Sequence, residues 1–158
     1  MTYTCQPTLF SRRTYEMHSQ GELYATMKMS FFGAQFSGKR SLEIIPNKKV
    51  FPTQYSVVDN NESSTAVLDF GGLKTFPEGR ITTDGNTEYV LERDDRNLIL
   101  KCDGRVLILL ESIHNGFFSI PSLKVTAYDD FEHHDTFDAL LFLGWYAMVG
   151  TVMGLNDG

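Results

Sequence analysis

The densest group of metal-capable side chains lies in the segment Asp130-Phe-Glu-His-His-Asp135. Carboxylate and imidazole groups are ligands for Zn and Fe, and a carboxylate beside a histidine also suits acid–base catalysis. Neighbouring His133 and His134 point apart in an extended chain, however, and no second ligand set accompanies them. The segment is therefore interpreted as an acidic linker that caps a helix. We predict no catalytic residue, metal or cofactor, with a metal-dependent enzyme using His133 and His134 as the alternative.

Three pairs of basic residues form the second candidate site. All lie in the first 50 residues, mostly at predicted turns. If neighbouring hairpins bring them together, they form a patch for phosphate groups of a membrane or for an acidic partner, with each charge contributing about 1 kcal/mol near an anionic bilayer. The alternative is ordinary solvated hairpin ends. The candidate phosphate- or lipid-binding residues are Arg12, Arg13, Lys39, Arg40, Lys48 and Lys49.

The charge of the 158-residue chain is unevenly distributed. Its 20 Asp and Glu exceed its 14 Lys and Arg, which gives a net charge of −6. The net charge is +4 over residues 1–50, −4 over residues 51–128 and −6 over residues 129–158. The acidic total argues against a nucleic-acid partner, because phosphate contacts need clustered Lys and Arg. It does not exclude a local basic patch near the N-terminus.

The two cysteines, Cys5 and Cys102, are too few for a disulfide framework and lack the spacing of a metal site. We interpret them as reduced thiols of a cytoplasmic protein, since disulfides are rare in reducing compartments. A single Cys5–Cys102 bond is the alternative. The first residues, Met-Thr-Tyr-Thr-Cys, lack the basic and apolar regions of a secretory signal. The expected location is the cytoplasm, with peripheral attachment to a membrane.

Most of the chain has the composition of β-strands. Turn residues recur about every 8–12 residues, a spacing typical of an all-β sandwich or barrel. Asp103-Gly104 predicts a two-residue hairpin, because both positions tolerate the positive φ of a type I′ turn. The stretch 71–80 is predicted to be a loop. The predicted strands are 3–10, 23–32, 41–45, 55–58, 66–70, 86–93, 98–102, 106–110 and 117–128.

The C-terminal region differs from the rest. Residues 139–155 contain no charged side chain, which predicts an apolar helix over about 136–155. Asp135 or Thr136 is expected to cap its start. Gly144, Ala147, Gly150 and Gly154 recur at helical spacing and predict a face that another surface approaches closely.

An all-apolar helix is either a membrane span or part of a protein core. Seventeen residues is near the lower limit for spanning about 30 Å of hydrocarbon, and the preceding flank is acidic. These features favour the buried helix over a tail anchor.

These elements predict one mainly β domain over residues 1–158. Strands in residues 1–128 would close into an antiparallel barrel of about 10–12 strands, wide enough to enclose a helix. Residues 129–135 would form the linker, and the C-terminal helix would thread the barrel. Closure also removes exposed sheet edges.

With this architecture, the chain resembles the tubby C-terminal-like superfamily, which includes the LURP-one-related proteins and resembles the phospholipid scramblases. The residues that carry the resemblance are Tyr3, Leu9-Phe10-Ser11, Gly21-Glu-Leu-Tyr-Ala25, Lys28-Met-Ser-Phe-Phe32 and Asp138-Ala-Leu-Leu-Phe-Leu-Gly-Trp-Tyr-Ala-Met-Val-Gly150. The resemblance implies a barrel around a central helix. The phosphoinositide-binding residues of tubby proteins have no matching positions, so none is assigned.

The sequence therefore predicts a non-enzymatic binding or scaffold protein. Its hairpin loops are expected to contact membrane phospholipid or a protein partner. The alternatives are a tail-anchored membrane protein with a small β domain and the metal-dependent enzyme described above.

Overall fold

The computed structural model describes residues 1–8, 11–30, 32–50, 52–61, 63–70, 78–113 and 122–150, without the side chains of Ser11 and Arg12. Within these ranges the chain forms strands, one short 3₁₀ helix and one α-helix. The strands are β1 (Thr2–Thr8), β2 (Ser11–Ser19), β3 (Glu22–Ser30), β4 (Gly33–Gly38), β5 (Leu42–Pro46), β6 (Gln54–Val58), β7 (Ser64–Asp69), β8 (Gly79–Thr83), β9 (Glu88–Asp94), β10 (Asn97–Cys102), β11 (Arg105–Ile113) and β12 (Ser122–Ala127). The helices are η1 (Phe131–His133) and α1 (Phe137–Met148).

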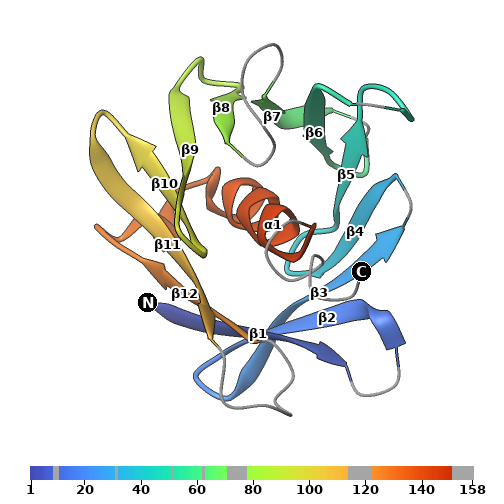
Figure 1. The fold of residues 1–158 in the computed structure, drawn as a ribbon, viewed down its shortest axis with the longest axis vertical. Coiled ribbons are helices and arrows are strands. Elements are labelled where there is room, and N and C mark those ends of the chain that lie inside the picture. The colour runs from blue at the N-terminus through green and yellow to red at the C-terminus, as the bar shows by residue number, and fades with distance from the viewer. Residues whose placement is uncertain are drawn as a thin grey trace.

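The twelve strands form one closed antiparallel barrel (Figure 1). Each strand pairs with the next along the chain, and β1 closes the barrel against β12, with Tyr3 opposite Val125. Side chains of successive residues alternate between the interior and the outer surface, as in β10, where Leu98 and Leu100 are buried. The predicted fold class is confirmed: a mainly β barrel with one C-terminal helix.

Helix α1 lies inside the ring of strands (Figure 1). All of its residues except Asp138 are buried, and Trp145 has 0% of its surface exposed. Phe142 stacks on Phe36 of β4 with ring centroids 4.5 Å apart. The helix therefore forms the core of the barrel, as predicted for a buried helix rather than a membrane anchor. Residues 151–155 of the predicted helix lie outside the described residues. Among those described, no helix is long and apolar enough to span a bilayer.

The predicted cap of α1 is wrong. Thr136 occupies the N-cap position, but its side chain makes no capping hydrogen bond. Its Oγ1 instead lies 2.9 Å from His134 Nδ1.

Three strands were missed. These are β2, which is rich in charged and polar residues, and the short strands β4 and β8, which contain glycines. Strand β8 begins at Gly79, inside the stretch predicted as a loop; residues 71–77 lie outside the described residues. The Asp103-Gly104 hairpin is confirmed, since φ is 51° and 79° at these residues and they join β10 to β11.

Cys5 and Cys102 are both free. Cys5 faces the core on β1, whereas Cys102 ends β10, and β11 and β12 separate these strands. Burial raises the pKa of the Cys5 thiol. The two thiols therefore do not pair in this fold.

Candidate functional site

The basic pairs lie at both ends of the barrel. Strand β5 separates the turn at Lys39 and Arg40 from the loop that carries Lys48 and Lys49. Since five residues of strand span about 17 Å, the two pairs are well apart. We call the end with Lys39 and Arg40 the linker end, because α1 and the segment before it begin there. The opposite end is called the tip end.

The six predicted residues thus do not form one patch. Arg12 and Arg13 begin β2 at the tip end, where Arg13 is exposed and the Arg12 side chain lies outside the described residues. At the linker end, Arg40 Nη1 donates to the backbone carbonyl of Asp135 at 3.4 Å. Arg40 is therefore held over the acidic linker, and the basic residues best placed for an external anion are at the tip end.

An asparagine shapes the loop at the tip end. Asn47 Oδ1 accepts from the backbone N–H groups of Thr53 and Gln54 at 3.0 and 3.1 Å, and its Nδ2 donates to Thr53 Oγ1 at 2.9 Å. The Asn47 backbone N–H also donates to the Gln54 carbonyl at 3.0 Å. These bonds close the neck of the loop, from which Lys48, Lys49 and Val50 project.

Basic and apolar side chains meet on this projection. Lys48 and Lys49 are exposed, and Val50 beside them has 68% of its surface exposed. Phe32, in the turn between β3 and β4, is 51% exposed, and Lys49 Nζ lies 5.8 Å from the centre of its ring. We call Phe32, Lys48, Lys49 and Val50 the tip. Glu43 is the only acid between residues 23 and 58, so this part of the chain is basic.

The linker brings together part of the predicted metal group. Ligand atoms of Asp130, Glu132 and His133 lie within 4.8 Å of one another. His133 Nε2 is 3.9 Å from Glu132 Oε1, but its side chain is 78% exposed. His134 turns away, with its ring stacked on Phe131 at 5.5 Å. The two histidines therefore do not act on one centre.

Two tyrosines join the linker end to the barrel wall. The Tyr24 hydroxyl on β3 donates to Asp138 Oδ1 at the start of α1. Burial, followed by the bond to Asp138, raises the Tyr24 pKa far above its usual value. Burial also raises the pKa of Tyr3 to about 12, with smaller contributions from the charges of Glu132 and Asp138. These contacts fix the first turn of α1 inside the barrel.

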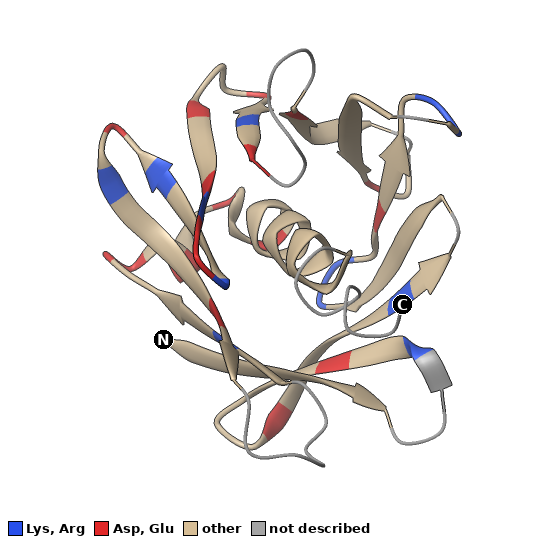
Figure 2. Cartoon of the chain, in the orientation of Figure 1, with Lys and Arg blue, Asp and Glu red and all other residues tan. Residues whose placement is uncertain are grey.

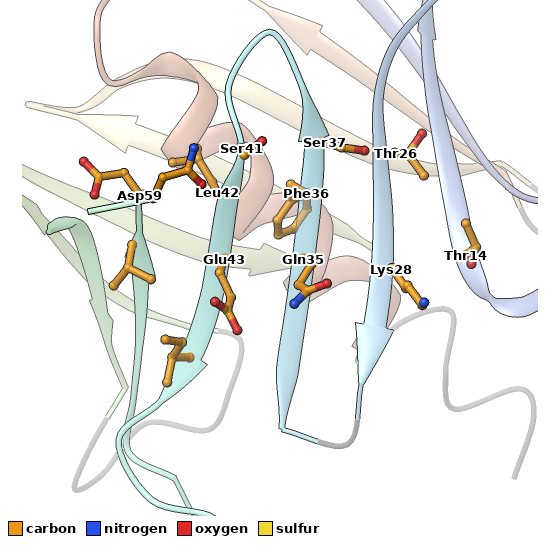
Figure 3. A pocket seen from close by; sticks show the side chains of 13 residues that line it. Thr14, Thr26, Lys28, Gln35, Phe36, Ser37, Ser41, Leu42, Glu43 and Asp59 are labelled. Atoms are coloured by element: carbon orange, nitrogen blue, oxygen red, sulfur yellow. The ribbon is translucent and has the colours of Figure 1, made fainter. Parts of the chain in front are cut away.

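A hollow of about 810 Å³ lies on the outer face of β2 to β6 (Figure 3). We call it the trough. Short hydroxyl side chains line much of it, namely those of Thr14, Thr26, Ser37 and Ser41. Its floor reaches the buried residues Phe36 and Leu42, the last pair in the ladder between β4 and β5.

One charged row crosses the trough. Lys28 on β3 is paired with Gln35 on β4, and Gln35 is paired with Glu43 on β5. All three side chains are exposed and line the trough, with Gln35 between the two charges (Figure 3). Within the part of the chain that the structure describes, their side chains form no hydrogen bond or ion pair.

Sequence reasoning missed the tip's apolar members and the whole row in the trough. The sequence Lys48-Lys49-Val50 did indicate an apolar member of the tip, since an apolar residue follows the basic pair at a turn. The row in the trough depends on the register of the paired strands, which cannot be deduced from the sequence alone.

Comparison of the chain with protein-family models, curated proteins and solved structures finds no match. Function is therefore argued from the geometry of the tip and the trough.

Proposed function

We propose that the protein is a non-enzymatic binding protein that attaches peripherally to anionic phospholipid surfaces through its tip. The observation that carries the proposal is that exposed lysines and exposed apolar side chains lie together at the tip. Proteins that lie at membrane interfaces combine these two types of contact, because cations attract anionic headgroups and apolar side chains enter the acyl boundary.

The tip supplies both contributions on a modest scale. Each lysine near an anionic surface contributes about 1 kcal/mol, so Lys48 and Lys49 together contribute about 2 kcal/mol. Val50 and Phe32 add apolar area at about 25 cal/mol per Å² that leaves water. Attachment of this strength is reversible and depends on salt, since exposed charges are screened over about 10 Å at 0.1 M ionic strength.

The distribution of charge favours one orientation. Figure 2 shows the loop between β5 and β6 as a basic projection, whereas acidic residues gather on the segment that precedes α1. That segment includes the exposed residues Asp129, Asp130 and Asp135 at the linker end. An anionic surface would attract the tip and repel the linker, and the exposed Asp94 and Asp95 in the β9–β10 turn, which lies at the same end as the tip, would tilt the barrel so that the tip alone meets the membrane.

We also propose that the chain is a member of the tubby C-terminal-like superfamily. The support is the barrel around a central helix, which is the architecture that the resemblance implies. The proposed membrane contact uses the tip of this chain and no residue carried over from tubby proteins.

Sedimentation with lipid vesicles tests the proposal. Wild-type protein should sediment with vesicles of phosphatidylserine and phosphatidylcholine and not with phosphatidylcholine alone. Loss of two lysine contributions corresponds to a weakening of about 30-fold, so the K48E/K49E variant should bind at least that much more weakly.

The matched control is R105E/K124E, which makes the same change in net charge on exposed residues of β11 and β12. This control should retain binding. Equal binding by the tip variant and wild type would overturn the proposal. Failure of wild type to bind anionic vesicles would also overturn it and would favour a protein partner for the tip.

A further inference from the structure

We propose that Lys28 and Glu43 set the roll of the membrane-attached barrel, that is, its rotation about the barrel axis. Lys28 turns toward the anionic surface and Glu43 turns away from it. This role rests on the proposed attachment through the tip and adds the face on which the attached barrel leans. Both are positioning residues that stay outside the bilayer, which the tip alone enters.

The tip lies on one side of the ring of strands. Phe32 belongs to the β3–β4 turn and Lys48 to the loop between β5 and β6. The β9–β10 turn lies across the ring from Phe32, with six strands between the two turns on either side. Its sequence, Arg93-Asp-Asp-Arg96, has no net positive charge, so it adds no attraction to an anionic surface. An attached barrel therefore leans onto the side of β3 to β5.

The charged row lies on that side and close to the tip end. Lys28 is two residues before the end of β3, and Glu43 is three residues before the end of β5. Both are thus about 7–10 Å from the ends of their strands. Exposed charges act over about 10 Å at 0.1 M ionic strength. Both charges therefore act on a surface that the tip touches.

The two charges lie on either side of β4, in the middle of the leaning face. Register places Lys28 beside Gln35 and Gln35 beside Glu43, so the backbones of the charged residues are about 10 Å apart. The Lys28 side chain is directed away from Gln35 (Figure 3), which increases its separation from Glu43. An anionic surface attracts the lysine and repels the glutamate. The barrel therefore rolls toward β3 and β2.

The face that turns toward the lipid can approach a polar headgroup layer. Its short side chains include those of Thr14, Thr26 and Ser37, whose hydroxyl groups can donate to and accept from headgroups and water. In the part of the chain that the structure describes, neither Lys28 nor Glu43 is held by a side-chain hydrogen bond or ion pair. Both charges are therefore available to the surface.

Exchange of the two charges tests the roll without changing the net charge. The K28E/E43K variant should sediment with vesicles of phosphatidylserine and phosphatidylcholine as wild type does, but with the opposite side of the row toward the lipid. A fluorophore on Thr14→Cys reports the β2 side, since Thr14 is paired with Lys28. A fluorophore on Val58→Cys reports the β6 side, since Val58 is paired with Glu43.

Quenching by a nitroxide on the phosphatidylcholine headgroup measures how close each label lies to the surface. Both labels are placed in a Cys102→Ser background, in which the remaining cysteine, Cys5, is buried. With the wild-type row, the label on β2 should be quenched more strongly than the label on β6. The charge exchange should reverse this order.

Single neutral variants test the two charges separately. Lys28→Gln should weaken vesicle binding about fivefold, the contribution of one charge near an anionic surface. Glu43→Gln should strengthen binding by less than about twofold, because its charge is turned away and screened. Lys124→Gln, on an exposed residue of β12, loses the same charge as Lys28→Gln and should bind as wild type does.

The outcomes separate the roll from the attachment itself. Equal quenching of each label before and after the exchange would overturn the roll, and the attachment would stand if K48E/K49E still lost binding. Equal binding by K28Q and K124Q would also overturn the roll. Failure of wild type to bind anionic vesicles would overturn both.

Discussion

A close approach between the helix and the barrel wall gives a sharp test of the fold. A Cβ atom added at Gly144 of α1 would lie 3.2 Å from both Cδ atoms of Leu110 on β11. Favourable contacts between carbon atoms begin at about 3.5 Å. The Gly144→Leu substitution therefore cannot fit while Leu110 keeps its place.

The expected energies follow from this contact. Overpacking costs about 1–3 kcal/mol, and the better helix propensity of leucine over glycine offsets up to about 1 kcal/mol, so G144L should lower the free energy of unfolding by up to about 2 kcal/mol. Leu110→Ala alone leaves a cavity and should cost about 2–5 kcal/mol. In the double variant the new side chain fills that cavity. The double variant should therefore lose less unfolding free energy than the two single variants lose in sum, by more than 1 kcal/mol.

Urea unfolding of the four proteins measures this coupling. The free energies are comparable if each transition is two-state and the slopes agree. Gly150→Leu is the control, because Gly150 is exposed, and it should change stability by less than about 0.5 kcal/mol. Losses at Gly144 and Leu110 that add to within about 0.5 kcal/mol would refute the reasoning, since additivity is the behaviour of residues that do not touch.

Three further predictions concern other parts of the molecule. Because burial raises the pKa of Tyr3 from 10 to about 12, its contribution to stability should be complete below pH 10 and lost as the pH rises from 10 to 12; Tyr3→Phe should remove that part of the pH dependence in thermal unfolding. Asn47→Ala removes the bonds at the neck of the tip loop and should lower stability by about 1 kcal/mol while weakening vesicle sedimentation; unchanged sedimentation would show that the loop needs no clamp. Gly104→Ala places a side chain at φ 79° and should cost about 1 kcal/mol in urea unfolding, whereas a stability equal to wild type would contradict the type I′ hairpin.

The sequence predicted the class of fold because two strong patterns agreed. Strand-like segments with regular turns indicated an all-β domain, and the uncharged run 139–155 could be stabilised only by burial on all sides. A barrel large enough to hold a helix satisfies both. Strand β4 was missed because Gly33, Ser37 and Gly38 have weak β propensity, and its pairing partners rather than its own residues stabilise it.

The candidate sites were predicted less well because they depend on pairing. The positions of Lys39 and Lys48 at opposite ends follow only once β5 is known to run the height of the barrel wall. Likewise, Lys28 and Glu43 are fifteen residues apart in the sequence, and the register of β3, β4 and β5 places them in one row. The spacing of small residues on the helix was only partly informative, since Gly144 and Ala147 are buried and Gly150 is exposed.

The most direct test of membrane attachment is the fluorescence of a V50W variant mixed with vesicles. Trp145 is fully buried, so its emission should stay constant and report no binding. If the tip enters the interface, the added indole should shift its emission to shorter wavelength with vesicles that contain phosphatidylserine, and brominated lipids should quench it. An added indole whose emission and quenching are the same with and without anionic vesicles would contradict the account.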